Sequence, residues 1–425
     1  MPTIVKKTMQ GSLYLKILAI FFFINISLNG QVIHTVNSTN DLDDGFCNSA
    51  HCSLREAINA ANNDGNTSII NFNIAGAGTQ VIAPNGPLPD ITESNLQIKG
   101  ETQGGNKGNL IVDFRYQNFG KNSYLKILAN QVSLSGIIFL KFSYTDTTDH
   151  ILQIGNTTFT SNNSEIKNCC FHSDNVPLDN NIYSSVLIRN AENFRFSNNL
   201  IGSDFGKTGI YQTDAAIISS NISTKDLVRI DSNIFVNNKT QLIVLNDNAR
   251  IANNIFGALD TLKNNNLFNA NIGIQIIDDV SQINIDDNFF QGFNFAGINA
   301  TIYNRLDITN NNFYNHSGNA IASLNLFPKP RFLNIDGNKA ISGNSFLDHE
   351  NSSFDELSLT NNHIEKFMHF INISSINSLN YFKYELNTIL CNSSKIVDLN
   401  TTPGAPAPPV ITSINLNTIS GTALP

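Results

Sequence analysis

One eight-residue pattern recurs along most of this chain and limits the folds open to it. The pattern is h-x-h-x-x-N-x-h, where h is an apolar residue and x is any residue. Eight copies follow in order: FRFSNNLI (194–201), VRIDSNIF (228–235), ARIANNIF (249–256), INIDDNFF (283–290), LDITNNNF (306–313), LNIDGNKA (333–340), LSLTNNHI (357–364) and FKYELNTI (382–389). An earlier copy, SEIKNCCF (164–171), has Cys169 in place of the asparagine. Asparagine abundance alone would not produce eight ordered copies.

The spacing of the copies indicates stacked coils. The asparagine recurs in steps of 21 to 34 residues, with a mean of about 27. Alternating apolar residues followed by asparagine are typical of a strand that ends in a turn. Irregular steps around a regular core favour a solenoid whose loops vary in length. The sequence therefore predicts an all-β chain, a single-stranded parallel β-helix with coils roughly 4.8 Å apart.

Stacking places equivalent residues of successive coils above one another. We expect the asparagines to form an inner ladder of amide hydrogen bonds, with their own backbone making the left-handed bend of the turn. The last apolar position should form a column in the core. Its members are Phe171, Ile201, Phe235, Phe256, Phe290, Phe313, Ile364 and Ile389.

The stretch CSLREAINAANND (52–64) predicts a helix in an otherwise strand-rich chain. Ser53 and Glu56 match a capping box. An apolar stripe at helical spacing is formed by Leu54, Ala57, Ile58 and Ala61. A β-helix has an open end that solenoids cover, so we expect this helix to cap the first coil. Cys47 and Cys52 are close enough in sequence to form a disulfide beside it.

The segment TVNSTNDLDDGFCNSAHCSLREAINAAN (35–62) resembles the CSLREA domain, and Cys52–Ala57 matches its defining hexapeptide completely. NLIGSDFGKTGI (199–210) is similar to a turn common in the repeats of those proteins, with Ser203 for threonine. The resemblance implies a right-handed single-stranded parallel β-helix (pectate-lyase-like), export and display on a bacterial cell surface. It implies no agreed activity or catalytic set.

The ends of the chain indicate export and a further module. Lysines precede the short apolar run ILAIFFFINISL (17–28), which predicts a signal peptide over residues 1–30. We expect the N-terminal cap and first coils over 31–100, the parallel β-helix over 101–398 and a Pro-rich linker over 399–410. Residues 411–425 predict the start of a β module that is cut off at Pro425. No later segment predicts a membrane span.

The net charge and the pattern of cysteines limit the classes of partner, metal and cofactor that we expect. The net charge of −8, with 26 basic against 34 acidic residues, gives no basic footprint for nucleic acid. No CxxC pair or histidine cluster has zinc-ligand spacing, so we expect no metal and no cofactor. Calcium is the cation that DLDDGF (41–46) would suit, but the loop lacks the distal glutamate of a calcium loop, and a turn explains it as well.

The position between the first two apolar residues of each copy should face solvent. It carries Glu165, Arg195, Arg229, Arg250, Asn284, Asp307, Asn334, Ser358 and Lys383 on successive coils. Three consecutive arginines are either a solvated face or an anion site for a uronate-containing or sulfated glycan, held by bidentate contacts.

Catalysis would need carboxylates that converge. The position after the second apolar residue places Asp231 and Asp286 two coils apart, roughly 9.6 Å, near the upper limit for an inverting glycosidase pair. Alternatively, these side chains bond the backbone of the turn. Asp231 and Asp286 are thus the catalytic candidates, and Arg195, Arg229 and Arg250 the ligand-binding candidates.

These observations favour an exported or cell-surface β-helix module for binding or structural display, which recognises polysaccharide or a cell-surface glycan. The alternative is a polysaccharide lyase or glycoside hydrolase that acts on acidic polysaccharide along the β-helix groove. We expect the chain to be monomeric within a longer multidomain protein.

Overall fold

The computed structural model describes most of the chain after residue 29. The described ranges are 30–65, 67–105, 108–114, 123–141, 150–173, 184–203, 215–219, 227–236, 238–245, 248–257, 270–277, 280–301, 303–324, 332–350, 352–373, 376–390, 397–399, 410–415 and 418–422. Residues 1–29 of the expected signal peptide, most of the linker and Cys391 lie outside these residues.

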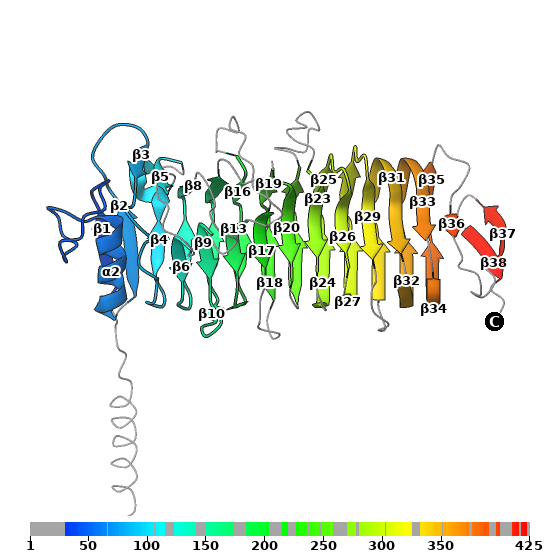
Figure 1. Cartoon of the computed structure of the whole chain (residues 1–425), viewed down its shortest axis with the longest axis horizontal. Helices are drawn as coiled ribbons and strands as arrows, with labels where there is room; N and C mark the ends of the chain where they lie inside the picture. The colour runs from blue at the N-terminus through cyan, green and yellow to red at the C-terminus, as the bar shows by residue number, and fades with distance from the viewer. Residues whose placement is uncertain are drawn as a thin grey trace, which may run out of the picture.

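Parallel strands stack side by side along the long axis of the molecule, in the order of the chain (Figure 1). One thirteen-strand sheet of the described residues carries the repeated pattern. Its strands are β1 (Val32–Val36), β2 (Ser68–Phe72), β4 (Gln97–Lys99), β7 (Ser133–Ser135), β11 (Glu165–Lys167), β15 (Arg195–Ser197), β18 (Val228–Asp231), β21 (Ala249–Ala252), β24 (Val280–Asp286), β27 (Tyr303–Thr309), β30 (Phe332–Asp336), β32 (Ser352–Thr360) and β34 (Ile376–Glu385).

The remaining strands of the coils form two further files that meet in long shared strands. One file contains β3 (Gln80–Ile82), β5 (Leu110–Asp113), β8 (Ile138–Lys141), β12 (Cys170–Ser173), β16 (Leu200–Ile201), β19 (Ile234–Phe235), β22 (Ile255–Phe256), β25 (Phe289–Gln291), β28 (Asn312–Tyr314), β31 (Lys339–Glu350), β33 (His363–Ile373) and β35 (Thr388–Leu390). The other contains β6 (Leu125–Ile127), β9 (Leu152–Ile154), β13 (Ser184–Ile188), β17 (Ala215–Ser219), β20 (Thr240–Val244), β23 (Ile272–Ile276), β26 (Ala296–Ala300), β29 (Asn319–Leu324) and β36 (Val397–Leu399), and it joins the first file at β31 and β33. Three files of parallel strands make a parallel β-helix, as the repeat predicts.

The ladder asparagines form a continuous inner row, and the prediction of a ladder is confirmed. Each side-chain oxygen accepts hydrogen bonds from the backbone N–H and the Nδ2 of the asparagine on the preceding coil, at 2.9–3.1 Å. The Nδ2 group also donates to a main-chain carbonyl of the preceding coil, as Asn254 does to Ile230 at 2.8 Å. The inner row runs from Asn199 to Asn387, and its members are buried. Burial is tolerated because every amide is hydrogen-bonded.

The location of the left-handed bend corrects one expectation. Positive φ angles occur at the residue before each ladder position, namely at Asn168, Asn198, Ser232, Asn253, Asp287, Asn310, Gly337, Asn361 and Leu386. The ladder asparagines themselves do not have positive φ. The preceding residue turns the chain, which leaves the asparagine free to direct its side chain inward.

The core column stacks as expected. Register pairs Phe235, Phe256, Phe290 and Phe313 on successive coils, and their ring centroids lie 4.8–4.9 Å apart with planes within 7° of parallel. Ala340 occupies the same register on the next coil. The column therefore combines apolar burial with offset aromatic contact along the axis.

The predicted helix closes the N-terminal end of the β-helix (Figure 1). Helix α2 (Leu54–Asp64) has the expected capping box between Ser53 and Glu56, and Gly65 ends it in the left-handed conformation. Its apolar stripe, including Leu54 and Ile58, is buried in the main core. The expected disulfide joins Cys47 to Cys52.

Five further elements complete the described chain. η1 (Gly100–Gly105) follows β4, and β10 (Ser161–Asn162) pairs with β14 (Ala191–Glu192). Near the C-terminus, β37 (Val410–Asn415) and β38 (Thr418–Thr422) form an antiparallel hairpin. Within the residues that the structure describes, no helix has the length and apolar character that spanning a bilayer requires.

Candidate functional site

The strand register brings the three predicted arginines together on the outside of the coils. Arg195, Arg229 and Arg250 are directly paired on β15, β18 and β21. We call the positions in register with them the outer arginine row; it continues through Asn284, Asp307, Asn334, Ser358 and Lys383. The second row lies two residues further along each strand. We call it the outer carboxylate row, and it contains Ser197, Asp231, Ala252, Asp286, Thr309, Asp336 and Thr360.

Two of the three arginines are held in bidentate ion pairs. The Nε and Nη2 atoms of Arg195 each donate to an oxygen of Asp231 at 3.0 Å. Arg250 donates in the same way to Asp286, at 3.1 and 2.7 Å. The side-chain hydrogen bonds to these carboxylates raise the pKa of both arginines above its ordinary value. Pairing explains how adjacent coils accommodate three like charges.

Arg229 differs from its two neighbours in the row. It is exposed, and within the described part of the chain it makes no ion pair or side-chain hydrogen bond. A pocket of about 220 Å³ opens beside it, lined by Arg195, Arg229, Asp231, Ser232, Arg250, Ala252 and Asn253. We call this the arginine pocket. It is an exposed cationic cavity with one guanidinium group available.

The two catalytic candidates serve as partners of the arginines. Asp231 and Asp286 lie in one register with Ala252 between them, so they are two coils apart, as the sequence predicts. Each carboxylate receives two N–H groups from an arginine. These contacts occupy both oxygens of each carboxylate, which leaves neither side chain free for a catalytic role.

A second and larger pocket, of about 650 Å³, was not foreseen from the sequence. His316, Ser317, Ser342, Gly343, Asn344, Lys366, Phe367, Met368 and His369 line it. The ring of His316 is buried and stacks on Phe293 at 5.6 Å. The Phe290 carbonyl lies near this ring but outside hydrogen-bond geometry, and burial lowers the pKa of His316 to about 3. The ring is therefore neutral at ordinary pH.

The acidic loop near the cap is engaged with protein donors. Asp41 binds Arg55 through two hydrogen bonds, and Asp43 accepts from the Gly45 N–H. Asp44 accepts from the Phe46 N–H. These contacts fit the interpretation of the segment as turns.

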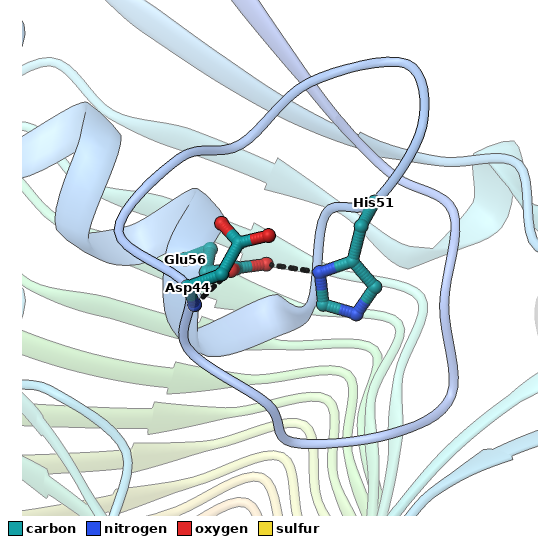
Figure 2. A group of neighbouring side chains, drawn as sticks. All are labelled: Asp44, His51 and Glu56. Carbon is teal, nitrogen blue, oxygen red and sulfur yellow. Dashed lines mark hydrogen bonds and ion pairs between the residues drawn. The ribbon is translucent and has the colours of Figure 1, made fainter.

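Asp44, His51 and Glu56 form the one cluster in the described chain with the residue types of a cation site (Figure 2). Their candidate ligand atoms lie within 4.8 Å of one another. Glu56 Oε1 accepts from the Asp44 N–H at 2.7 Å, while Oε2 accepts from the Ser53 N–H at 2.8 Å and lies 3.0 Å from His51 Nδ1. The capping box uses Oε2 of Glu56, and the Asp44 N–H uses Oε1, so Glu56 ties the acidic loop to the start of α2.

The sequence itself carries one signal for the two ion pairs, which is the spacing between the paired residues. Arg195 and Asp231 are 36 residues apart, and so are Arg250 and Asp286. The larger pocket gives no such signal, because its residues come from the segment after β28 and from within strands β31 and β33 of the next two coils. Only the folded coil brings His316, Lys366 and His369 to one cavity.

Comparisons with known proteins agree with the architecture. No protein-family model matches the chain, and no curated protein matches it in sequence. The tailspike protein of Escherichia coli bacteriophage HK620, solved in complex with a pentasaccharide, aligns with a TM-score of 0.50 and 13% identity, covering 85% of this chain and 78% of the tailspike. A double mutant of that tailspike, also with pentasaccharide, aligns with a TM-score of 0.52 at the same identity and coverage.

A third structure, the mannuronan C-5 epimerase AlgE4 A-module of Azotobacter vinelandii, aligns with a TM-score of 0.45 and 12% identity, covering 86% of this chain and 98% of the module. A TM-score this low supports no argument. The tailspike alignments show the fold alone, since their identity is low. The chain is therefore a parallel β-helix protein.

Proposed function

We propose that this chain is an exported β-helix module that binds polysaccharide along its outer face. The observation that carries the proposal is the arginine pocket, which places an available guanidinium group on a row of outward side chains. Rows that repeat at roughly 4.8 Å along a straight face suit an extended polymer better than a compact ligand. The tailspike of similar fold, solved with a pentasaccharide, gives an example of a β-helix protein with a bound glycan.

Export and display complete the proposal. Residues 1–30 serve as a signal peptide, and the cap around Cys52–Ala57 is a CSLREA-like domain. The buried stripe of α2 and the Cys47–Cys52 disulfide support a cap of this kind, in a compartment that permits disulfides. The chain acts as a binding module that is displayed outside the cell.

A binding panel tests the function. The purified chain is applied to immobilised neutral, uronate-containing and sulfated oligosaccharides, together with an Arg195/Arg229/Arg250→Ser triple variant. We expect the wild type to bind at least one glycan class and the triple variant to lose most of that binding, because the pocket loses its cationic groups. Absence of binding to every glycan would refute the proposed function.

A second assay distinguishes binding from catalysis. Incubation with pectate, alginate and hyaluronan is followed by analysis for new reducing ends or unsaturated products. We expect none, because Asp231 and Asp286 are engaged by arginines. Product formation would favour the lyase or hydrolase alternative and direct attention to the larger pocket around His316.

A further inference from the structure

The two ion pairs made by arginines of the outer arginine row follow one rule of register. Arg195 on β15 binds Asp231, which lies on the next coil in the outer carboxylate row. Arg250 on β21 binds Asp286, again on the next coil and in the same row. Each arginine thus reaches to the coil after its own and to the position two residues further along the strand. The rule describes two pairs with the same geometry, and Arg229 lies on the coil between the two arginines.

Applied to Arg229, the rule points to a residue that has no carboxylate. Arg229 lies on β18, and the position one coil on in the outer carboxylate row is Ala252. Asp231 precedes Ala252 in that row and Asp286 follows it. A methyl group therefore stands where the repeat would place an acceptor for Arg229. The arginine pocket lies at this point, and both Arg229 and Ala252 line it.

We propose that the space above Ala252 holds one carboxylate of an acidic sugar, bound in bidentate fashion by Arg229. This inference rests on the proposed glycan-binding function and names the chemical class that the site selects. The bound carboxylate completes a row of three ion pairs whose first and third members are Arg195–Asp231 and Arg250–Asp286. Repulsion from Asp231 and Asp286 is limited, because each is neutralised by its own arginine.

The neighbouring coils favour a carboxylate over other anions. The two filled positions of the row are occupied by planar carboxylates that accept two parallel N–H groups, a geometry that matches the guanidinium fork. The space at Ala252 corresponds to the carboxylate that an aspartate would carry there. A neutral sugar would leave the charge of Arg229 uncompensated inside the pocket.

The test compares a uronate trisaccharide with its uncharged ester and with a sulfated sugar. Galacturonate trisaccharide, its methyl ester and a sulfated dextran trisaccharide are titrated into the wild-type chain by calorimetry. Arg229→Gln removes the guanidinium group, and Ala252→Asp supplies a carboxylate from the protein itself. Arg305→Gln is the matched control, since Arg305 is half exposed and already paired with Asp307 on its own strand.

We expect the acid to bind at least about tenfold more tightly than the ester, and Arg229→Gln to remove that difference. Ala252→Asp should weaken acid binding to a similar degree while the variant stays folded with an unchanged melting temperature or a slightly higher one. Arg305→Gln should bind as the wild type does. This pattern would support the carboxylate site.

Three results would overturn the inference. Equal binding of acid and ester, unaffected by Arg229→Gln, would refute the carboxylate site and leave the proposed glycan binding intact. Tighter binding of the sulfated trisaccharide through Arg229 would refute the carboxylate class. A lack of binding to any glycan of the wider panel would refute the proposed function, and this inference with it.

Discussion

The inner asparagine row and the outer arginine row run through the same coils, yet they are completed to different extents. In the inner row, each asparagine from Asn199 onward is bonded to the next as far as Asn387. In the outer row, Arg195 and Arg250 are paired with carboxylates, while for Arg229 between them the corresponding position carries Ala252.

The difference follows from the environment of each row. A missing link inside the coil would leave buried polar groups without partners, which costs about 1–3 kcal/mol for each group. On the surface water replaces a missing partner, so a gap costs little. The regular inner row is therefore needed for stability, while a gap in an outer row costs little stability and can form a binding site.

Breaking the inner row should produce the largest effect. Asn254→Ala removes the acceptor of the Asn233 N–H and of its Nδ2, and also a donor to the Ile230 carbonyl. We expect the free energy of unfolding to fall by about 4 kcal/mol, since several buried groups lose partners. Urea denaturation measures the change, with the exposed Asn253→Gly as a control at the adjacent turn. A loss below about 1 kcal/mol would show that the inner row is not essential to stability.

Exposing the N-terminal end of the core should have the second-largest effect on stability. Ile58→Asp places a charge on the buried stripe of α2, against the first coils. We expect a loss of about 3 kcal/mol and an increased tendency to aggregate, because the covered coil end is exposed. Light scattering during heating measures this, with the exposed Asn63→Asp as the control. A variant as monomeric and as heat-resistant as the parent would contradict the role of the cap.

His316 is a buried polar residue outside the inner row. We expect it to make the free energy of unfolding depend on pH. Burial lowers its pKa to about 3 in the folded chain, so the unfolded chain binds an extra proton between about pH 6.5 and pH 3. Its contribution is complete above pH 6.5, and stability falls by about 1.4 kcal/mol per pH unit as the pH drops through this window. Urea titrations of wild type and His316→Leu at several pH values measure the slope. An identical slope in the variant would exclude His316 as the cause.

An asparagine at position 169 would extend the inner row, and it should stabilise the chain relative to alanine at the same position. Cys169 stands at a ladder position: its N–H donates to Asn199 Oδ1, and its thiol lies near the Leu134 and Lys167 carbonyls. These carbonyls correspond by register to those that the Asn233 amide contacts. We expect Cys169→Asn to raise the free energy of unfolding by about 1 kcal/mol over Cys169→Ala in urea melts. An asparagine variant less stable than the alanine variant would show that the first position cannot accept the amide.

Breaking the outer row should have the smallest effect. Arg250→Gln removes a surface ion pair with Asp286 and should lower stability by less than about 1 kcal/mol. Arg229→Gln removes an arginine without a pair in the described chain and should leave stability unchanged within about 0.5 kcal/mol. Urea melts at low and high salt compare the two variants. A larger loss for Arg229→Gln than for Arg250→Gln would reverse the assignment of the unpaired arginine.

The sequence alone determined the repeating unit, the order of the coils and the cap. The recurring asparagine, the alternating apolar residues and the capping box depend on contacts within one coil, or on stacking identical coils. The register of Arg195, Arg229 and Arg250, and of Asp231 and Asp286, was predictable for the same reason. The expected left-handed asparagine was wrong because the residue before it makes the bend.

Only the tertiary structure decided which outer charges meet. Arg195 and Asp231 are predicted separately as binding and catalytic candidates, yet they form one ion pair, because a long side chain reaches across to the next coil. The cavity around His316 likewise depends on how the segment after β28 lies against strands β31 and β33 of the next two coils. Strand periodicity is a local property that a sequence displays directly. Side-chain direction and turn shape are set by neighbours that lie more than twenty residues away.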